Sequence, residues 1–214
     1  MVGGHLSVNG AFGRETTMQT MTRTSTLTTE EGVRLLAWGF FGVQFFLGYE
    51  WLMSGLAKVM AGDFASSLAG TLSDMTKDQT GWYKSFIDGV VIPNGPTFGY
   101  LVMLGELSVG TVLIATSLIW FARWSDLSSR NRGFLVALVA LVGLVGATMS
   151  INFHLAMGAN APWTIAADPN DQGVDLDSLL AMLQLVLATV CVGYLVLARR
   201  RADRLAEEVE SLRS

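Results

Sequence analysis

The sequence predicts an all-α integral membrane protein: a four-helix bundle of transmembrane spans, with short surface helices in its first outer loop and a cytoplasmic C-terminal helix extension. Three observations lead to this fold class. Of the 214 residues, 51% are hydrophobic and only 15% are charged. The mean hydropathy is +0.44. Four apolar runs are each long enough to cross a bilayer, which takes about 20 residues.

The first 30 residues are rich in Thr, Gly, Met and Ser and lack the apolar core of a signal peptide. We therefore expect a flexible cytoplasmic tail over residues 1–30 and a four-span transmembrane domain over residues 31–198. Thr28-Thr29-Glu30-Glu31 is typical of a helix start, because hydroxyl groups cap the first turn and acidic residues favour the positive end of the helix dipole. The first span follows over residues 34–60.

The first outer loop begins after Met60. Residues 64–92 mix apolar and polar side chains at helical spacing and include Trp82 and Tyr83, but no run in them is long enough to cross. Aromatic rings with a polar edge favour the headgroup zone of a membrane. We expect short helices on the membrane surface here, ended by a break at Pro93-Asn94-Gly95-Pro96.

The remaining spans are predicted over residues 97–121, 133–155 and 178–198. Every arginine falls on one side of the resulting topology: in the two tails, at Arg34 where the first span begins, or in the link between the second and third spans. By the positive-inside rule that side is cytoplasmic, which makes the chain a multi-pass protein of the plasma membrane with both termini inside. The outward loop after the third span is acidic and has no basic residue.

Residues 199–214 are expected to form an amphipathic cytoplasmic helix. Leu205, Val209 and Leu212 share one stripe and charges occupy the rest. The stripe fits a contact with a partner. Pairs such as Arg204 with Glu208 equally fit a solvated helix that stabilises itself.

Ionisable residues inside the spans are the candidate functional residues. By the rise of a helix, Glu50 lies about 15 Å and Glu106 about 13 Å from the outer ends of their spans. Carboxylates near the middle of a bilayer are costly, so both should face the bundle interior, and the available cations are Lys58 and His154. Glu50, Ser54 and Lys58 follow four-residue steps along one side of the first helix.

The third and fourth spans extend this pattern. His154 follows Gly146 and Ser150 at four-residue steps, and Gln184 lies about 10 Å below the outer end of the fourth span. Together these residues predict a polar pocket that opens outward. Each also has a structural explanation: the carboxylates could hold helices together, His154 could bond a loop carbonyl, and Lys58 could reach the headgroups.

Several kinds of site are disfavoured. Cys191 is the single cysteine and His154 the single histidine outside the tail, so no haem or iron–sulfur centre is expected on this chain. The run 168–173 resembles the start of a calcium loop, but Leu179 stands where that loop needs a glutamate. The basic residues form no free patch, so we expect the lipid bilayer as a partner and no nucleic acid.

The order of these features resembles the DoxX and DoxD family of four-span membrane proteins over about residues 33–198. The matching marks are Arg34 at the start of the first span, Gly55-Leu-Ala-Lys58, Gly105-Glu106, and Asn152-Phe-His-Leu-Ala-Met-Gly158 running on to Asn160-Ala-Pro162. Glu50, His154 and the long Thr-rich tail are not marks of the family.

The resemblance implies a membrane subunit linked to quinone, with a thiosulfate-type donor and a second, smaller subunit. Glu106 and Glu50 would then be the catalytic residues and relay protons. Lys58 or His154 would bind an anionic donor, and Asn152, Gln184 and Ser54 would complete the site for quinone or substrate. The competing class is a non-catalytic accessory or assembly subunit of a larger membrane protein complex.

Overall fold

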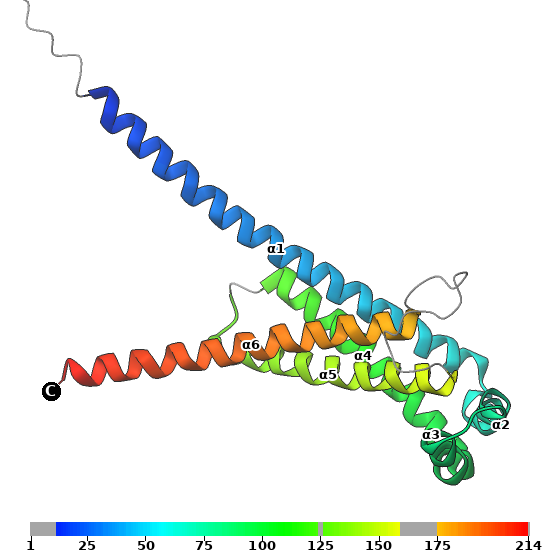
Figure 1. Cartoon of the computed structure of the whole chain (residues 1–214). Coiled ribbons are helices and arrows are strands. Elements are labelled where there is room, and N and C mark those ends of the chain that lie inside the picture. The colour runs from blue at the N-terminus through cyan, green and yellow to red at the C-terminus, as the bar shows by residue number, and fades with distance from the viewer. Residues whose placement is uncertain (1–11, 124–125, 159–174, 214) are drawn as a thin grey trace, which may run out of the picture. The chain divides into compact units, whose positions relative to one another are not determined.

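The computed structural model describes residues 12–123, 126–158 and 175–213, and this part of the chain is helical and contains no strand (Figure 1). The all-α class is therefore confirmed for these residues. In chain order the elements are α1 (Phe12–Ala61), α2 (Phe64–Thr76), α3 (Trp82–Phe86), the π-helical turn η1 (Ile87–Val91), the 3-10 turn η2 (Ile92–Asn94), α4 (Gly95–Arg123), α5 (Ser129–Ala156) and α6 (Leu176–Ser211).

The chain divides into two compact units, Met1–Gly42 and Val43–Ser214, and α1 contributes to both. In the first unit the described residues, from Phe12 onward, are helical throughout. The helix thus begins inside the stretch that we expected to be a flexible tail. Proline is absent between Phe12 and Gly42, so the sequence places no strong helix breaker there.

Within the part of the chain that the structure describes, three helical stretches are long and apolar enough to cross a membrane: Trp82–Arg123, Ser129–Ala156 and Leu176–Ser211. They contain the predicted second, third and fourth spans. The predicted first span, inside α1, is not among the three. A membrane protein is thereby supported, while the count of four spans stays a prediction.

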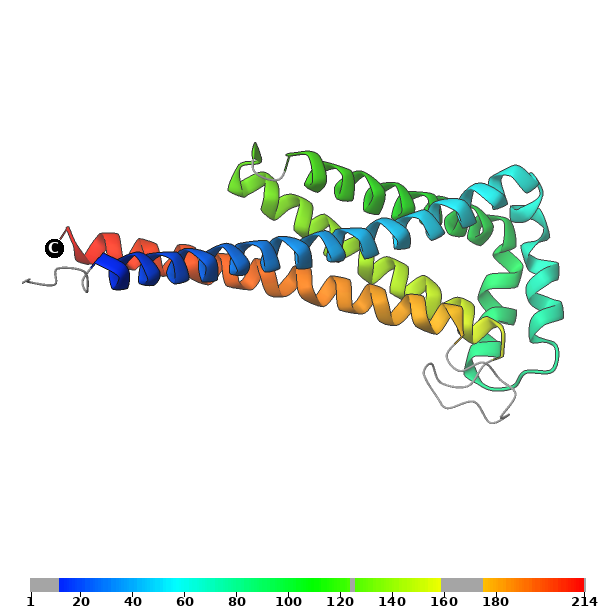
Figure 2. The same ribbon diagram turned by 90° about the horizontal axis from the view of Figure 1, so that it is seen from above.

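The segment predicted to be the first outer loop is mostly helical, and its elements gather at the end of the second unit where α4 begins (Figure 2). Leu72 of α2, Ile87 and Val91 of η1, and Ala156 of α5 form a buried cluster that holds these short helices against the bundle. The predicted break at Pro93-Asn94-Gly95-Pro96 coincides with an element boundary, because the 3-10 turn η2 ends at Asn94 and α4 begins at Gly95. Both prolines lie in first turns, of η2 and α4, where the missing N–H removes no helical hydrogen bond.

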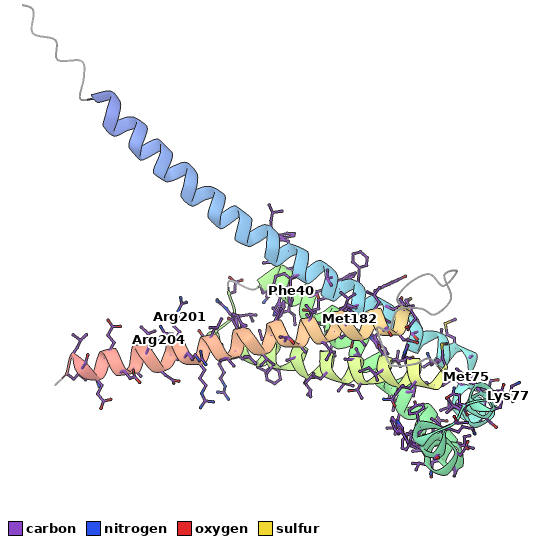
Figure 3. The ribbon with its side chains drawn as sticks, viewed as in Figure 1. Phe40, Met75, Lys77, Met182, Arg201 and Arg204 are labelled. Carbon is purple, nitrogen blue, oxygen red and sulfur yellow. The ribbon has the colours of Figure 1, made fainter. Side chains whose placement is uncertain are left out.

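Helices α5 and α6 run side by side (Figures 1 and 2). Small residues face the contact: Gly146 of α5 lies against the Gln184 side chain of α6, and Gly143 lies against Ala188. Cys191 is buried on the same face of α6. Beyond that contact α6 continues as an exposed helix that carries Arg201 and Arg204, at the far end from Met75 and Lys77 of the α2 segment (Figure 3).

Glycines bring the Val43–Ala61 part of α1 against α4. A Cβ on Gly110 would meet the backbone of Leu52, and one on Gly48 would lie 2.9 Å from the Cβ of Leu113. The Gln44 amide crosses the same contact and donates to the Leu113 carbonyl at 3.0 Å and the Thr116 hydroxyl at 2.7 Å. These two helices therefore pack backbone to backbone, as small residues permit in membrane helices.

We expect Gly110→Ala to lower the free energy of unfolding by about 1–3 kcal/mol, because the added methyl group would overlap the α1 backbone and force the helices apart. SDS titration of the purified protein measures this. Gly193→Ala is the matched control, since a Cβ there would meet nothing within 4 Å. Equal effects of the two substitutions would contradict close α1–α4 packing.

Candidate functional site

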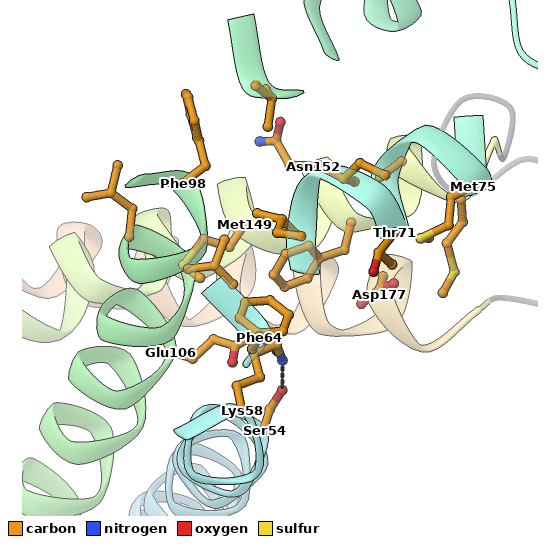
Figure 4. Close-up of a pocket in the computed structure, with 18 of the residues that line it drawn as sticks. Ser54, Lys58, Phe64, Thr71, Met75, Phe98, Glu106, Met149, Asn152 and Asp177 are labelled. Atoms are coloured by element: carbon orange, nitrogen blue, oxygen red, sulfur yellow. Dashed lines mark hydrogen bonds and ion pairs between the residues drawn. The ribbon is translucent and has the colours of Figure 1, made fainter. Parts of the chain in front are cut away.

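A buried ion pair joins α1 to α4 beside the close helix contact. Gly55 makes it possible: a Cβ at this position would lie 2.9 Å from the backbone nitrogen of Leu107 and 3.1 Å from the Cβ of Glu106. One turn further along α1, the Lys58 Nζ lies 2.8 Å from Glu106 Oε1 and donates to the Ser54 hydroxyl at 2.9 Å (Figure 4). Two sequence marks, Gly55-x-x-Lys58 and Gly105-Glu106, thus meet in space.

The two partners of this pair differ in exposure. The Glu106 side chain is fully buried, with both carboxylate oxygens covered, whereas 23% of the Lys58 side chain is exposed. The Lys58 ammonium also lies 5.4 Å from the centre of the Phe64 ring, a cation–π contact. Lys58 is therefore the group that a ligand can reach, and Glu106 holds that ammonium in place from behind.

Lys58 projects into a cavity of about 640 Å³ in the second unit. Most of its wall is apolar and comes from α1, α2, α3, η1 and all three later helices, so that Phe98 and Met149 lie across from the ion pair (Figure 4). The polar and charged lining residues are Glu50, Ser54, Lys58, Thr71, Tyr83, Glu106, Asn152 and Asp177. An apolar cavity with a few convergent polar groups is the usual form of a small-molecule site.

Five of the seven predicted site residues line this cavity: Glu50, Ser54, Lys58, Glu106 and Asn152. Glu50 is exposed at its edge. Asn152 is held near the first outer loop, because the Tyr83 hydroxyl donates to its carbonyl oxygen at 2.9 Å. The structure therefore brings these residues, from α1, α4 and α5, around one space.

The other two predicted residues lie elsewhere, between α5 and α6. The Gln184 side chain is fully buried against Gly146 and does not line the cavity. His154 is 6% exposed, and its Nδ1 lies 3.0 Å from Asp175 Oδ2 and 3.2 Å from the Ser178 hydroxyl. Neither residue shares a pocket with Lys58, so the predicted polar site is smaller than the sequence suggested.

Asp175 explains what His154 does. It caps the N-terminus of α6, accepting from the Ser178 N–H at 2.9 Å, while it pairs with His154 at the end of α5. Partial burial acts to raise the pKa of Asp175, but the hydrogen bonds from Ser178 and the interaction with His154 outweigh it and lower that pKa below its ordinary value. These contacts hold the C-terminal end of α5 to the N-terminal end of α6.

Most of the lining residues were not predicted from the sequence, among them Trp51, Phe64 and Asp177. Trp51 lies three residues before Ser54 and seven before Lys58, so helical spacing places it on their face and could have identified it. Phe64 and Asp177 come from the first outer loop and the start of α6, and no spacing relates them to the ion pair. Only the fold brings those two to the cavity.

The described residues contain no group of three or more His, Cys, Asp or Glu side chains that could hold a metal ion. The calcium-like run 168–173 and the Asn160-Ala-Pro162 mark lie outside the described residues. Comparisons with models of protein families, with curated proteins and with solved structures found no match. The site therefore has to be interpreted from its own geometry.

We expect Lys58→Met to lower the free energy of unfolding by up to about 3 kcal/mol, the low end for a broken buried pair, because Lys58 is partly exposed. The loss arises from leaving the Glu106 carboxylate buried without its cation. Adding Glu106→Gln to that variant removes the charge and should restore most of the loss. SDS titration of the two single variants and the double variant measures the coupling. Additive effects would contradict the ion pair.

Proposed function

We propose that this chain is a membrane subunit of the DoxX and DoxD type that takes part in quinone-linked electron transfer. In this proposal it forms a four-span bundle in the plasma membrane with both termini in the cytoplasm. A second subunit works with it, and a thiosulfate-type donor supplies the electrons. The observation that carries the proposal is the Lys58 ammonium, held over a buried carboxylate at the wall of an apolar cavity.

The residues present fit a quinone. Its ring is apolar and uncharged, and its carbonyl oxygens accept hydrogen bonds. Among the described residues the Lys58 Nζ, with three N–H donors, has two partners, Ser54 and Glu106, which leaves one donor for a ligand. The cavity volume lies within the range of about 300–1,000 Å³ that is usual for small-molecule sites. A bound quinone would supply the electron and proton acceptance that this chain's side chains lack.

The chain's own residues have distinct roles in this proposal. Lys58 donates a hydrogen bond to a ligand oxygen and stabilises negative charge there. Glu106 keeps Lys58 charged and positioned. After Lys58 gives a proton to the ligand, a proton taken up by Glu106 can pass to Lys58 across the 2.8 Å contact. Glu50, exposed at the cavity edge, is placed to pass protons from the surface. Phe64 and the apolar wall exclude water from the head of the ligand.

We expect quinone to co-purify with the protein in about equimolar amount. We also expect Glu106→Gln to reduce quinone-dependent turnover at least tenfold, because Lys58 loses the carboxylate that orients it. Organic extraction followed by mass spectrometry measures the first quantity, and quinone reduction in membranes measures the second. Glu207→Gln, on the exposed end of α6, is the control. Turnover that is unchanged in Glu106→Gln would sink the proposed role.

An accessory subunit is the second candidate function. The ion pair supports it directly, because Lys58 and Glu106 connect α1 to α4 and would do so in a protein without turnover. The apolar side chains of Leu205, Val209 and Leu212 are exposed on the end of α6 and could contact a partner. Organic extraction of the purified protein separates the two candidate functions. If the extract contains no quinone and another protein co-purifies in stoichiometric amount, the accessory function is favoured.

The proposed orientation predicts which loops a membrane-impermeant thiol reagent reaches. In a Cys191→Ser background, Lys77→Cys in the first outer loop should react in intact cells, and Ser211→Cys near the end of α6 only after lysis. Labelling with a maleimide that shifts gel mobility reports both positions. The reverse pattern would overturn the orientation while leaving the helical fold untouched.

A further inference from the structure

We propose that this cavity binds an uncharged head group whose lipid tail leaves across Leu101 into the bilayer, and that it excludes small anions. This deepens the proposed function and rests on it. It identifies the quinone of the site as a tailed one that arrives from the lipid phase. It also implies that a thiosulfate-type anion is oxidised on another chain and not in this cavity.

The charges around the cavity argue against an anionic ligand. Lys58 is the single basic residue among the described lining residues, and its charge is already matched by Glu106 at 2.8 Å. Apart from Tyr83, whose phenol is neutral at pH 7, the other ionisable side chains that line the wall at some exposure are Glu50 and Asp177, both acidic. A dissolved anion would therefore meet no unmatched positive charge and two carboxylates that repel it. An uncharged carbonyl needs only the remaining Lys58 donor.

The rim of the cavity includes a side chain that is also on the protein surface. Leu101 of α4 lines the cavity and yet is 58% exposed, so its side chain belongs to both the wall and the outer surface. It lies in one of the stretches that are apolar and long enough to cross a membrane. In the proposed four-span bundle, an exposed side chain of this stretch faces lipid. Phe98 and Val102, which also line the cavity, continue the apolar surface inward. An apolar tail can follow this surface from the bilayer to the head group.

Neighbouring leucines provide a matched test. Leu104 is on α4, as Leu101 is, and is 60% exposed, but it does not line the cavity. On α6, Leu176 lines the cavity, whereas Leu179 is exposed and does not. Binding of a decyl-substituted benzoquinone and of the same ring without its tail can be followed through quenching of tryptophan fluorescence, because Trp51 lines the cavity.

We expect the tailed compound to bind more tightly, and Leu101→Ser to weaken its binding about three- to tenfold by removing part of a leucine's apolar contact. Leu101→Ser should not change the binding of the compound without a tail. Leu104→Ser and Leu179→Ser should bind both compounds as the unsubstituted protein does, and Leu101→Ala should show an intermediate loss if the serine variant does not fold. Leu176 also lines the cavity and is 60% exposed, so Leu176→Ser is measured beside these variants. Losses that are equal in Leu101→Ser and Leu104→Ser, or a loss in Leu176→Ser alone, would overturn the proposed path of the tail.

Anion exclusion is tested on the same protein. Thiosulfate should not displace the tailed quinone beyond the effect of sodium chloride at equal ionic strength, and should begin to compete in a Glu50→Gln/Asp177→Asn variant. Competition in the unsubstituted protein would overturn the exclusion.

Failure of this inference and failure of the proposed function give different results. Quinone binding that does not depend on the tail contradicts the inference and leaves quinone binding intact. If quinones fail to bind while a decyl-substituted dimethoxybenzene binds in a Leu101-dependent way, the lipid-tail site stands and the quinone function falls.

Discussion

The close contact between α1 and α4 controls the rest of the site, because it decides whether two opposite charges can meet inside an apolar protein. Gly55 allows the α1 backbone to reach α4 beside Glu106, and Lys58 then lies 2.8 Å from that carboxylate. Removing either charge from water is costly, and only short distance with further hydrogen bonding offsets the cost. Ser54 supplies one such bond, so geometry and electrostatics support each other at this position.

The cavity depends on elements that come from distant parts of the chain. The helices α4, α5 and α6 provide one wall, and the short helices of the first outer loop provide another, held by the cluster around Leu72 and Ile87. The pairing of His154 with Asp175 connects α5 to α6 next to Leu176 and Asp177, which line the same space. The ion pair is therefore enclosed by an apolar wall while Lys58 stays within reach of a ligand.

Sequence reasoning succeeded where one helix carries the information and failed where two helices must be placed. Four-residue steps correctly put Glu50, Ser54 and Lys58 on one face of α1, and their cavity is shared with Glu106. The same steps put Ser150 and His154 on one face of α5, but that face is turned toward α6 and away from the cavity. Periodicity identifies a face and gives no information about which neighbour covers it.

By itself the sequence determined the all-helical class and the apolar stretches that could cross a membrane, because composition and 3.6-residue periodicity are local properties. The sequence also supplied the two short motifs Gly55-x-x-Lys58 and Gly105-Glu106. Only the tertiary structure decided that these motifs meet, that Glu106 is buried behind Lys58, and that Phe64 and Asp177 complete the wall. Those features depend on the distances between segments far apart in the chain, which are set by packing and not by local spacing.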